Sequence, residues 1–271
     1  MDRRAGTVFS SSHGSDTPID SDARTGSDAL TDEIQRLRNE LDRRGRETQR
    51  LLDGVVHDLR AAERAIRTSA ELLRDELGEA LIGPAEATFR QLLEGVARMN
   101  PILTGVSSYS VSLPAARHSF WRVPTEVALR SALASLDREI RESGAVISHD
   151  PLPEVLGDSE RLQALFRNLI GNALKYRDAT APRINIQVKA NSGDWIFSVR
   201  DNGIGIDQKY WHDLFVPFKR LHGSEIPGVG LGLAICRKIV ETHSGRIWIE
   251  SPAGGGTTFL FTLPMDAGAD E

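Results

Sequence analysis

The sequence lacks several features that would each define a class of protein. Its single cysteine, Cys236, excludes a disulfide framework and a cysteine-rich metal site. No apolar run reaches the roughly eighteen residues of a membrane span, and the N-terminus has no signal-peptide hydrophobic core. The formal net charge of −5 gives no general basic surface, which argues against nucleic acid as the main partner. We therefore expect a cytoplasmic protein with no membrane span in this chain.

The first 28 residues also contain few apolar side chains and are rich in Ser, Asp, Gly and Thr. Such a segment cannot bury enough surface to offset the entropy lost on ordering. We therefore expect a disordered tail over residues 1–28 and a second short tail over residues 266–271.

A helical pattern begins near Leu30 and predicts a hairpin over residues 29–110. Two apolar rows recur every seven residues, formed by Leu52, Leu59, Ile66 and Leu73 and by Leu41, Thr48, Val55 and Ala62. Gly78, Gly83 and Pro84 interrupt the pattern, and a second helical run follows. Because two helices with one apolar face each do not close a core, the pattern predicts a homodimer with a four-helix bundle. His57 lies off both rows and is expected to face solvent.

After a linker at residues 111–120, residues 121–265 alternate between helix and strand signals. The runs RINIQVKA and DWIFSVRD predict one antiparallel pair of strands, and RIWIES and TTFLFTL predict another. The run TEVALRSALASLDREIRE predicts one amphipathic helix, and Asp158 is the expected N-cap of the next. We expect an α+β two-layer sandwich in which the strands form antiparallel pairs and the helices cover one face.

Two groups of glycines stand out in this second region. The first lies in DNGIGI, which begins at Asp201, and it also suits an ordinary hairpin turn after a strand. The second comprises Gly228, Gly230 and Gly232 and runs directly into an apolar-periodic helix. Glycine lets backbone N–H groups approach phosphate oxygens, and the positive end of that helix would face whatever the glycines surround.

Asn168, Asn172 and Lys175 are spaced so that they share one face of the predicted helix after Asp158. Amide oxygens suit a hard cation, and a lysine supplies a charge for phosphate. The alternative is a solvated helix face with ordinary surface amides.

The motifs RNLIGNALKY, DNGIGI, FVPFKRLHG, PGVGLGLAI and GGGTTFLFTL follow one another in this order. The succession closely resembles the ATP-binding domain of sensor histidine kinases, within the ATPase fold shared with gyrase and the Hsp90 chaperones. The sequence from FKRLHGSE to the end of TTFLFTLP is particularly similar to that of the phytochrome-type branch. The resemblance extends over about residues 45–264.

The resemblance implies ATP and Mg²⁺ as cofactors. It assigns Asn172 and Asn168 to the metal, Lys175 to the phosphates, and Asp201 to the adenine amino group. Residues 207–227 match a mobile lid over the nucleotide, within which Lys219 or Arg220 would face phosphate. The glycines implied in nucleotide binding are Gly203, Gly205, Gly228, Gly230 and Gly232.

The run VVHDLR resembles the phosphoacceptor box of the same family. The resemblance implies that His57 accepts the phosphoryl group of ATP, that Asp58 assists it, and that Arg60 supplies a nearby cation. It further implies transfer to an aspartate in the receiver domain of a response regulator. Ala62 replaces the usual proline, and Ala61 stands where many members carry a Thr or Asn associated with phosphatase activity.

Two other functions remain open from the sequence. Ala62 and the following Glu63 suit a pseudokinase or scaffold that binds ATP and a regulator with little transfer. A kinase of the same ATPase superfamily that phosphorylates Ser or Thr is the other alternative, although the hairpin with His57 argues against it.

Overall fold

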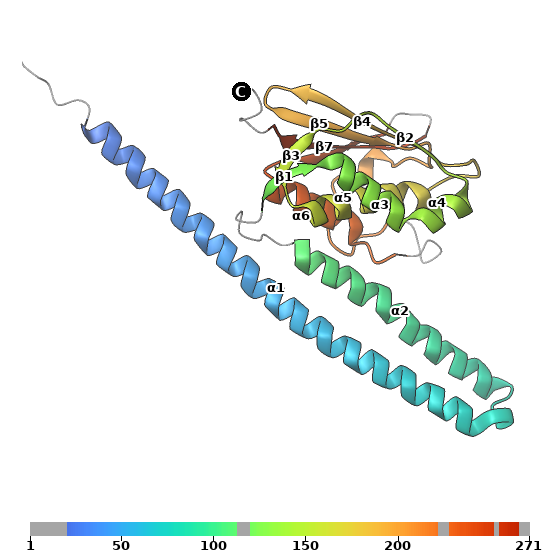
Figure 1. The fold of residues 1–271 in the computed structure, drawn as a ribbon. Coiled ribbons are helices and arrows are strands. Elements are labelled where there is room, and N and C mark those ends of the chain that lie inside the picture. Colours follow the sequence, from blue (N-terminus) through green and yellow to red (C-terminus); the bar gives the residue numbers. More distant parts are fainter. Residues whose placement is uncertain (1–20, 113–119, 222–227, 252–254, 266–271) are drawn as a thin grey trace, which may run out of the picture. The chain divides into compact units, whose positions relative to one another are not determined.

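The computed structural model describes residues 21–112, 120–221, 228–251 and 255–265 (Figure 1). The chain divides into two compact units, Met1–Arg43 and Arg44–Glu271. The described part of the first unit is the beginning of helix α1, which spans Ser21–Leu77. The second unit contains the rest of α1 and every other element of the described chain.

Helix α1 begins earlier than the sequence pattern predicted. Its first residue is Ser21, so residues 21–28 are helical, and their assignment to the disordered tail was wrong. Residues 1–20, the rest of the predicted tail, lie outside the described residues.

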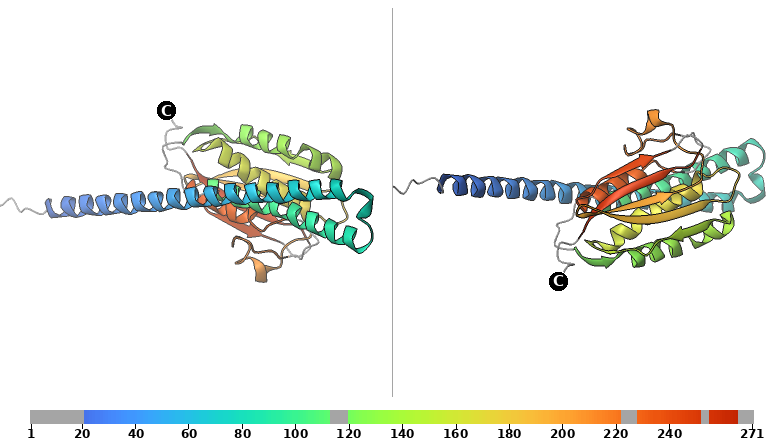
Figure 2. Two further views of the ribbon diagram at one scale, coloured as in Figure 1. Left: turned by 90° about the horizontal axis from the view of Figure 1, so that it is seen from below. Right: turned by 90° about the horizontal axis from the view of Figure 1, so that it is seen from above.

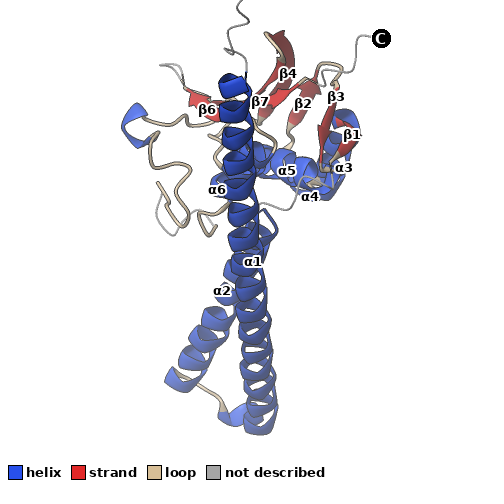
Figure 3. Ribbon diagram, turned by 90° about the vertical axis from the view of Figure 1, so that its left-hand side faces the viewer, coloured by secondary structure: helices blue, strands red, loops and turns tan. Residues whose placement is uncertain are grey.

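Helix α2 (Pro84–Ser112) follows α1 after a short 3-10 turn at Gly78–Ala80, and Figure 3 shows the resulting hairpin. Gly78 and Gly83 have φ angles of 48° and 60°, a left-handed conformation that glycine adopts without strain. Pro84 occupies the first helical position, where its missing N–H costs no hydrogen bond. The predicted helix, break and helix are thus confirmed.

The buried row of α1 differs from the rows read in the sequence. Val56, Glu63 and Ala70, seven residues apart, are buried. Leu59 and Ile66 of the predicted rows remain 43% and 45% exposed. In the second unit, α1 therefore has a buried row and a neighbouring apolar row that stays accessible.

The main sheet has five strands in the order β2-β4-β5-β7-β6. They are β2 (Val146–His149), β4 (Arg183–Asn191), β5 (Asp194–Arg200), β6 (Ile247–Glu250) and β7 (Thr258–Pro264). The antiparallel pairs β4 with β5 and β6 with β7 are confirmed. Strand β2, however, pairs parallel with β4, so the expectation of antiparallel pairs throughout was wrong. The long connection between β2 and β4 supplies the crossover that a parallel pair requires.

Helices cover one face of this sheet, as Figure 2 shows, and complete the predicted two-layer sandwich. They are α3 (Thr125–Ser135), α4 (Asp137–Ser143), α5 (Ser159–Lys175) and α6 (Gly232–Thr242). Strands β1 (Trp121–Pro124) and β3 (Glu154–Gly157) form a separate small antiparallel sheet. The core is centred on stacked Phe197 and Phe261, 4.9 Å apart, with the edge of Phe166 against both.

The predicted helix over TEVALRSALASLDREIRE divides into α3 and α4 at Leu136. Ser135 Oγ donates to the carbonyl oxygen of Ala132, a local bond that competes with the helical pattern. An ion pair between Arg141 and Asp137 at 2.6 Å then lies within the new helix. The single helix expected there was therefore wrong, although both parts are helical.

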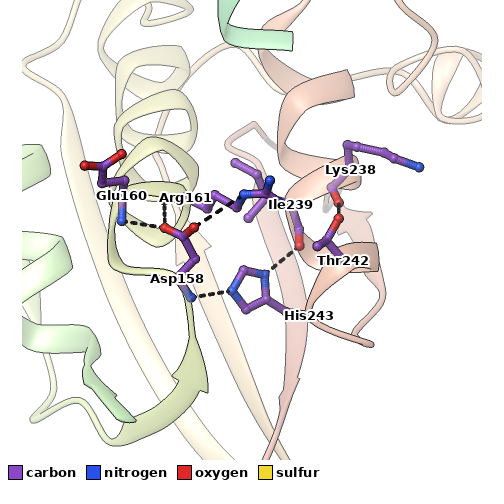
Figure 4. Close-up of polar contacts among 7 residues, drawn as sticks. All are labelled: Asp158, Glu160, Arg161, Lys238, Ile239, Thr242 and His243. Carbon is purple, nitrogen blue, oxygen red and sulfur yellow. Dashed lines mark hydrogen bonds and ion pairs between the residues drawn. The ribbon is translucent and has the colours of Figure 1, made fainter. Parts of the chain in front are cut away.

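A buried histidine joins helices α5 and α6 of the sandwich (Figure 4). His243 Nδ1 donates to the carbonyl oxygen of Ile239 at 2.8 Å, and Nε2 accepts from the backbone N–H of Asp158 at 3.1 Å. Its ring stacks on Phe120 with a centroid distance of 4.5 Å. Burial lowers the pKa of His243, and the nearby Arg161 acts in the same direction. The neutral ring thus connects the end of α6 to the N-cap of α5.

This contact predicts a loss of stability in acid. Below the ordinary histidine pKa of about 6.5, the unfolded chain takes up a proton that folded His243 resists, so unfolding becomes more favourable as the pH falls. Urea unfolding of the Arg44–Glu271 unit between about pH 5 and pH 7.5 measures the effect, which can reach about 1.4 kcal/mol per pH unit. In His243→Gln, the amide oxygen can still accept from the backbone N–H of Asp158. This variant should lose the contribution of His243 to the pH dependence of the unfolding free energy.

The exposed His212, with a side chain 76% accessible, provides the matched control. His212→Gln should leave the pH dependence of unfolding as it is in the original chain. Equal slopes for the original chain and His243→Gln would contradict the role assigned to the buried ring.

Candidate functional site

A cavity of about 710 Å³ lies beside α5 and the start of α6. Its lining includes ten of the residues selected from the sequence, which are Asn168, Asn172, Lys175, Asp201, Gly205, Lys219, Arg220, Gly228, Gly230 and Gly232. The volume lies within the range of small-molecule sites. Residues from separate motifs therefore converge on one space large enough for a nucleotide-sized ligand.

Asp201 lies at one side of the cavity, directly after β5. Its Oδ1 accepts from the backbone N–H groups of Gly203 at 2.8 Å and Thr257 at 3.0 Å. Burial raises the pKa of Asp201, and the two hydrogen bonds oppose that rise. Because both bonds end on Oδ1, the carboxylate is fixed in orientation while Oδ2 can accept from a ligand.

Gly203 supports this carboxylate from outside the cavity. A Cβ atom at Gly203 would collide with the carbonyl oxygen of Tyr176, and one at Gly256 would lie 2.5 Å from the carbonyl oxygen of Asp201. The two glycines are also joined, since Gly256 N–H donates to the Gly203 carbonyl at 2.8 Å. Three backbone segments therefore meet around Asp201 at distances that exclude side chains.

Another part of the cavity lining carries a positive charge and backbone glycines. Lys175 Nζ donates to the Tyr176 hydroxyl at 3.0 Å and lies against the backbone of Gly228. Gly230 has a φ of 78°, and Gly232 begins α6. The N-terminus of α6 and the Lys175 ammonium thus face the same space, an arrangement suited to an anion.

Asn168 and Asn172 line this cavity, and their amide oxygens are possible ligands for a cation. Asn168 Nδ2 donates to the Ala164 carbonyl at 2.9 Å, and Oδ1 lies on the side of Gly232. Among the described residues, no group of three or more His, Cys, Asp or Glu side chains could hold a metal. A cation here would need further oxygen ligands from a bound phosphate or water, which matches the ordinary coordination of Mg²⁺.

The segment after Asp201 forms the third side of the cavity. Lys219 Nζ pairs with Asp213 Oδ2 at 3.1 Å. Phe218 has a left-handed φ of 63°, and its N–H donates to the Gly230 carbonyl at 2.9 Å. Phe215 packs against the core, whereas Phe218 is 59% exposed. Residues 222–227 of the predicted lid lie outside the described residues.

Helix α2 contributes lining residues that the sequence motifs did not indicate, among them Asn100, Pro101 and Thr104. At Gly105, a Cβ atom would stand 3.0 Å from Leu231 Cδ1, so glycine permits the approach of α2 to the start of α6. Thr257, whose N–H binds Asp201, was also missed. Its place after the GGG run is a usable signal, but nothing local in the helical pattern of α2 indicates a cavity wall.

His57, Asp58 and Arg60 do not appear among the described residues that line the cavity. His57 lies next to buried Val56, and its side chain is 79% exposed, so the prediction that it faces solvent is confirmed. Its Nδ1 lies 3.2 Å from Asp58 Oδ1. Asp58 therefore engages one ring nitrogen and leaves Nε2 accessible as a nucleophile. Arg60 is half-buried, one turn further on.

Comparison with known families assigns the class of this domain. Residues 157–267 match the family described as histidine kinase-, DNA gyrase B-, and HSP90-like ATPase. This match contains α5, the Asp201 segment, the glycine-rich segment and α6. The second half of the chain is therefore an ATP-binding domain of this class.

Curated relatives extend the similarity into the helical hairpin. Cyanobacterial phytochrome A of Nostoc sp. (strain PCC 7120) is 41% identical over 235 residues, which are 86% of this chain and 31% of the relative. The adaptive-response sensory kinase SasA of Prochlorococcus marinus (strain MIT 9301) is 30% identical over 254 residues, 89% of this chain and 66% of the relative. The chain thus spans less than a third of the phytochrome's length.

Full-length ShkA in complex with AMPPNP has a similar structure, with a TM-score of 0.59 and 25% identity. The likeness covers 79% of this chain and 45% of ShkA. Together these findings show that the chain belongs to the sensor histidine kinase family and has the organisation of its transmitter module. No described helix is long and apolar enough to cross a membrane.

The close backbone approach at Gly203 predicts a specific sensitivity. Gly203→Ala should destabilise the domain by about 1 to 3 kcal/mol, because the new methyl group meets a backbone carbonyl that cannot move aside. Gly171→Ala is the matched control, since its Cβ would meet Leu136 Cδ2 at an ordinary 4.0 Å. Within a helix this control change should be neutral or stabilising. Urea unfolding compares the two, and equal stabilities would contradict the packing described here.

Proposed function

We propose that this chain is an ATP-dependent protein histidine kinase that phosphorylates itself on His57 and passes the phosphoryl group to a response regulator. The observation that carries the proposal is the convergence of Asp201, Asn172 and Lys175 on one cavity. The same chain presents an exposed histidine whose Nδ1 is engaged by Asp58. A nucleotide site and a nucleophile are thus both available.

Asp201 is the residue that recognises adenine in this proposal. Its Oδ1 is occupied by two backbone donors, so Oδ2 accepts from the exocyclic amino group of the base. Gly205, with a φ of 72°, lines the cavity without a side chain and leaves room for the base plane. A guanine would present a carbonyl oxygen instead of the amino group, and two acceptors would then face each other.

The phosphates would occupy the side of the cavity formed by Lys175, Gly228 and the start of α6. Lys175 and the N-terminus of α6 offset their negative charge. Asn168 and Asn172 would hold Mg²⁺ through their amide oxygens, and the metal supplies charge neutralisation for phosphoryl transfer when it is bound. Among the described residues of the lid, the cations Lys219 and Arg220 line the cavity and would face the phosphates.

In the transfer step, the lone pair on His57 Nε2 attacks the γ-phosphorus. A bond between Nε2 and phosphorus forms, the bond to the β,γ-bridging oxygen breaks, and ADP leaves with that electron pair. Asp58 accepts the hydrogen bond from Nδ1–H and stabilises the positive charge that develops on the ring. Arg60, one turn along α1, adds a cation for the transferred phosphoryl oxygens.

Two partners belong to the proposal. A second copy would cover the accessible row of α1, in which Leu59, Ile66 and Leu73 are 43%, 45% and 47% exposed. A response regulator would take the phosphoryl group from His57 onto an aspartate. The histidine kinase ThkA, which shares this fold with a TM-score of 0.54 and 21% identity, is known in complex with the response regulator protein TrrA.

A scaffold with little transfer is the second candidate, and one structural observation favours it. Helix α1 continues without interruption through Ala62, where the family has a proline, and Glu63 is buried with 5% exposure. A charged side chain in that row and a helix without the usual kink could both weaken presentation of His57. Labelling with ATP separates the two candidates directly.

The kinase proposal predicts a phosphoryl group with the stability of a phosphoramidate. Incubation with labelled ATP and Mg²⁺ should give a protein-bound phosphate that is lost in acid and retained in alkali. His57→Gln should abolish it, because an amide has no nucleophilic ring nitrogen. His149→Gln, at the end of β2, should label like the original chain. An acid-stable phosphate that persists in His57→Gln would support the Ser/Thr kinase alternative instead.

The adenine assignment predicts a selective loss of nucleotide affinity. In Asp201→Asn, Oδ1 can still accept from Gly203 and Thr257, but the amide presents a donor toward the donor on adenine. We expect the Kd for ATP to rise roughly ten- to hundredfold, the effect of losing a hydrogen bond to a charged group. Calorimetric titration measures the Kd, and urea unfolding at neutral pH should show no loss of stability, since burial already disfavours the carboxylate. Unchanged ATP affinity would contradict the assignment.

A further inference from the structure

One row of buried residues in the hairpin contains a polar side chain at a position where an apolar one is expected. Val96, Leu103 and Ser110 of α2 are spaced seven residues apart and are all buried. Ser110 has an exposure of 0%. A hydroxyl that is removed from water at this position costs free energy unless it is hydrogen-bonded.

Ser110 meets this requirement through helix α1. Its Oγ donates to Asp53 Oδ1 at 2.7 Å and also lies 3.2 Å from the carbonyl oxygen of Gln49. Both acceptors belong to α1 and are one helical turn apart. The contact therefore holds one particular turn of α1 beside the last turn of α2. The bond to the carboxylate is charge-assisted, which makes it stronger than a bond between neutral groups.

The position of this contact relates it to the phosphoacceptor. Asp53 precedes His57 by four residues, so the two share a face of α1 and are one turn apart. Sliding α1 by a turn would move His57 by about 5.4 Å and separate Asp53 from Ser110. Ser110 also lies in the last turn of α2, just before residues 113–119, which connect the hairpin to β1.

We propose that Ser110 is a positioning residue for phosphoryl transfer, because its hydrogen bond to Asp53 sets the register of α1 against α2 and hence where His57 is presented. A buried polar residue in a seam between helices is a well-attested means of fixing register. A sliding or rotation of α1 that displaces His57 must first break this bond. The inference rests on the proposed function in one respect, namely that His57 is the phosphoacceptor.

The kinetic test separates positioning from nucleotide binding. Ser110→Ala and Asp53→Ala should each lower the rate of His57 phosphorylation at saturating ATP by about tenfold, the scale expected for a small misplacement of reacting groups. The Kd for ATP should stay unchanged. Asp53→Asn keeps an acceptor oxygen for Ser110 and should retain most of the rate. The double variant Ser110→Ala/Asp53→Ala should be no slower than either single variant.

A distance measurement tests the register itself and does not depend on catalysis. The single cysteine, Cys236, is buried with 0% exposure, so spin labels attach selectively to cysteines introduced at exposed positions. Arg50→Cys on α1 and Val111→Cys on α2 flank the contact, and excess unlabelled protein isolates distances within one chain. With Ser110 and Asp53 intact, the distance between the two spin labels should have a narrow distribution. Ser110→Ala should shift or broaden that distribution.

The outcomes decide between the claims. A slower rate and a shifted distance in Ser110→Ala, with recovery in Asp53→Asn, supports the proposal. An unchanged rate and distance in Ser110→Ala overturns it, as does an Asp53→Asn variant as slow as Asp53→Ala. If the original chain forms no phosphohistidine, the proposed function fails, while the distance comparison still tests the register. Should Ser110→Ala not fold, the Asp53 variants carry both measurements, because Asp53 is exposed.

Discussion

The proposed nucleotide site depends on the approach of backbone segments around Asp201. The register between β5 and β7 pairs Arg200 with Thr258, which brings Thr257 beside Asp201. Asp201 N–H then donates to the Thr257 carbonyl at 2.8 Å, and its side chain accepts from Thr257 N–H at 3.0 Å. Gly203 and Gly256 close this arrangement without side chains. The Asp201 carboxylate is thereby held partly buried in one orientation, in which it can accept a hydrogen bond from a ligand.

Helices α5 and α6 position the other parts of the site relative to Asp201. Helix α5 carries the two asparagines and Lys175, and α6 begins where the glycine-rich segment ends. His243 fastens the far ends of the two helices to each other through Asp158 and Ile239. The cavity is thus lined both by residues of the helices and sheet and by the segment that contains Lys219. This division suits a ligand that is recognised at its base and enclosed at its phosphates.

The sequence predicted the sandwich and most of the cavity because its signals there are local. Asn168, Asn172 and Lys175 share a helix face by spacing alone, and the glycines mark places where backbone must approach. What it missed depends on long-range packing. The parallel pairing of β2 with β4 follows from a crossover, and the buried row at Val56 follows from how α1 meets α2. The α2 residues at the cavity likewise carry no signal of their own, since their role depends on contact with Leu231.

The central claim is that ATP bound beside Asp201 phosphorylates His57. Mass spectrometric mapping at neutral pH, after incubation with Mg²⁺ and ATP, tests it most directly. The account predicts that the phosphoryl group lies on the peptide containing His57 and that fragmentation assigns it to the imidazole. Nucleotide binding without any phosphorylated peptide, or a phosphoryl group on a serine or threonine instead, would contradict it.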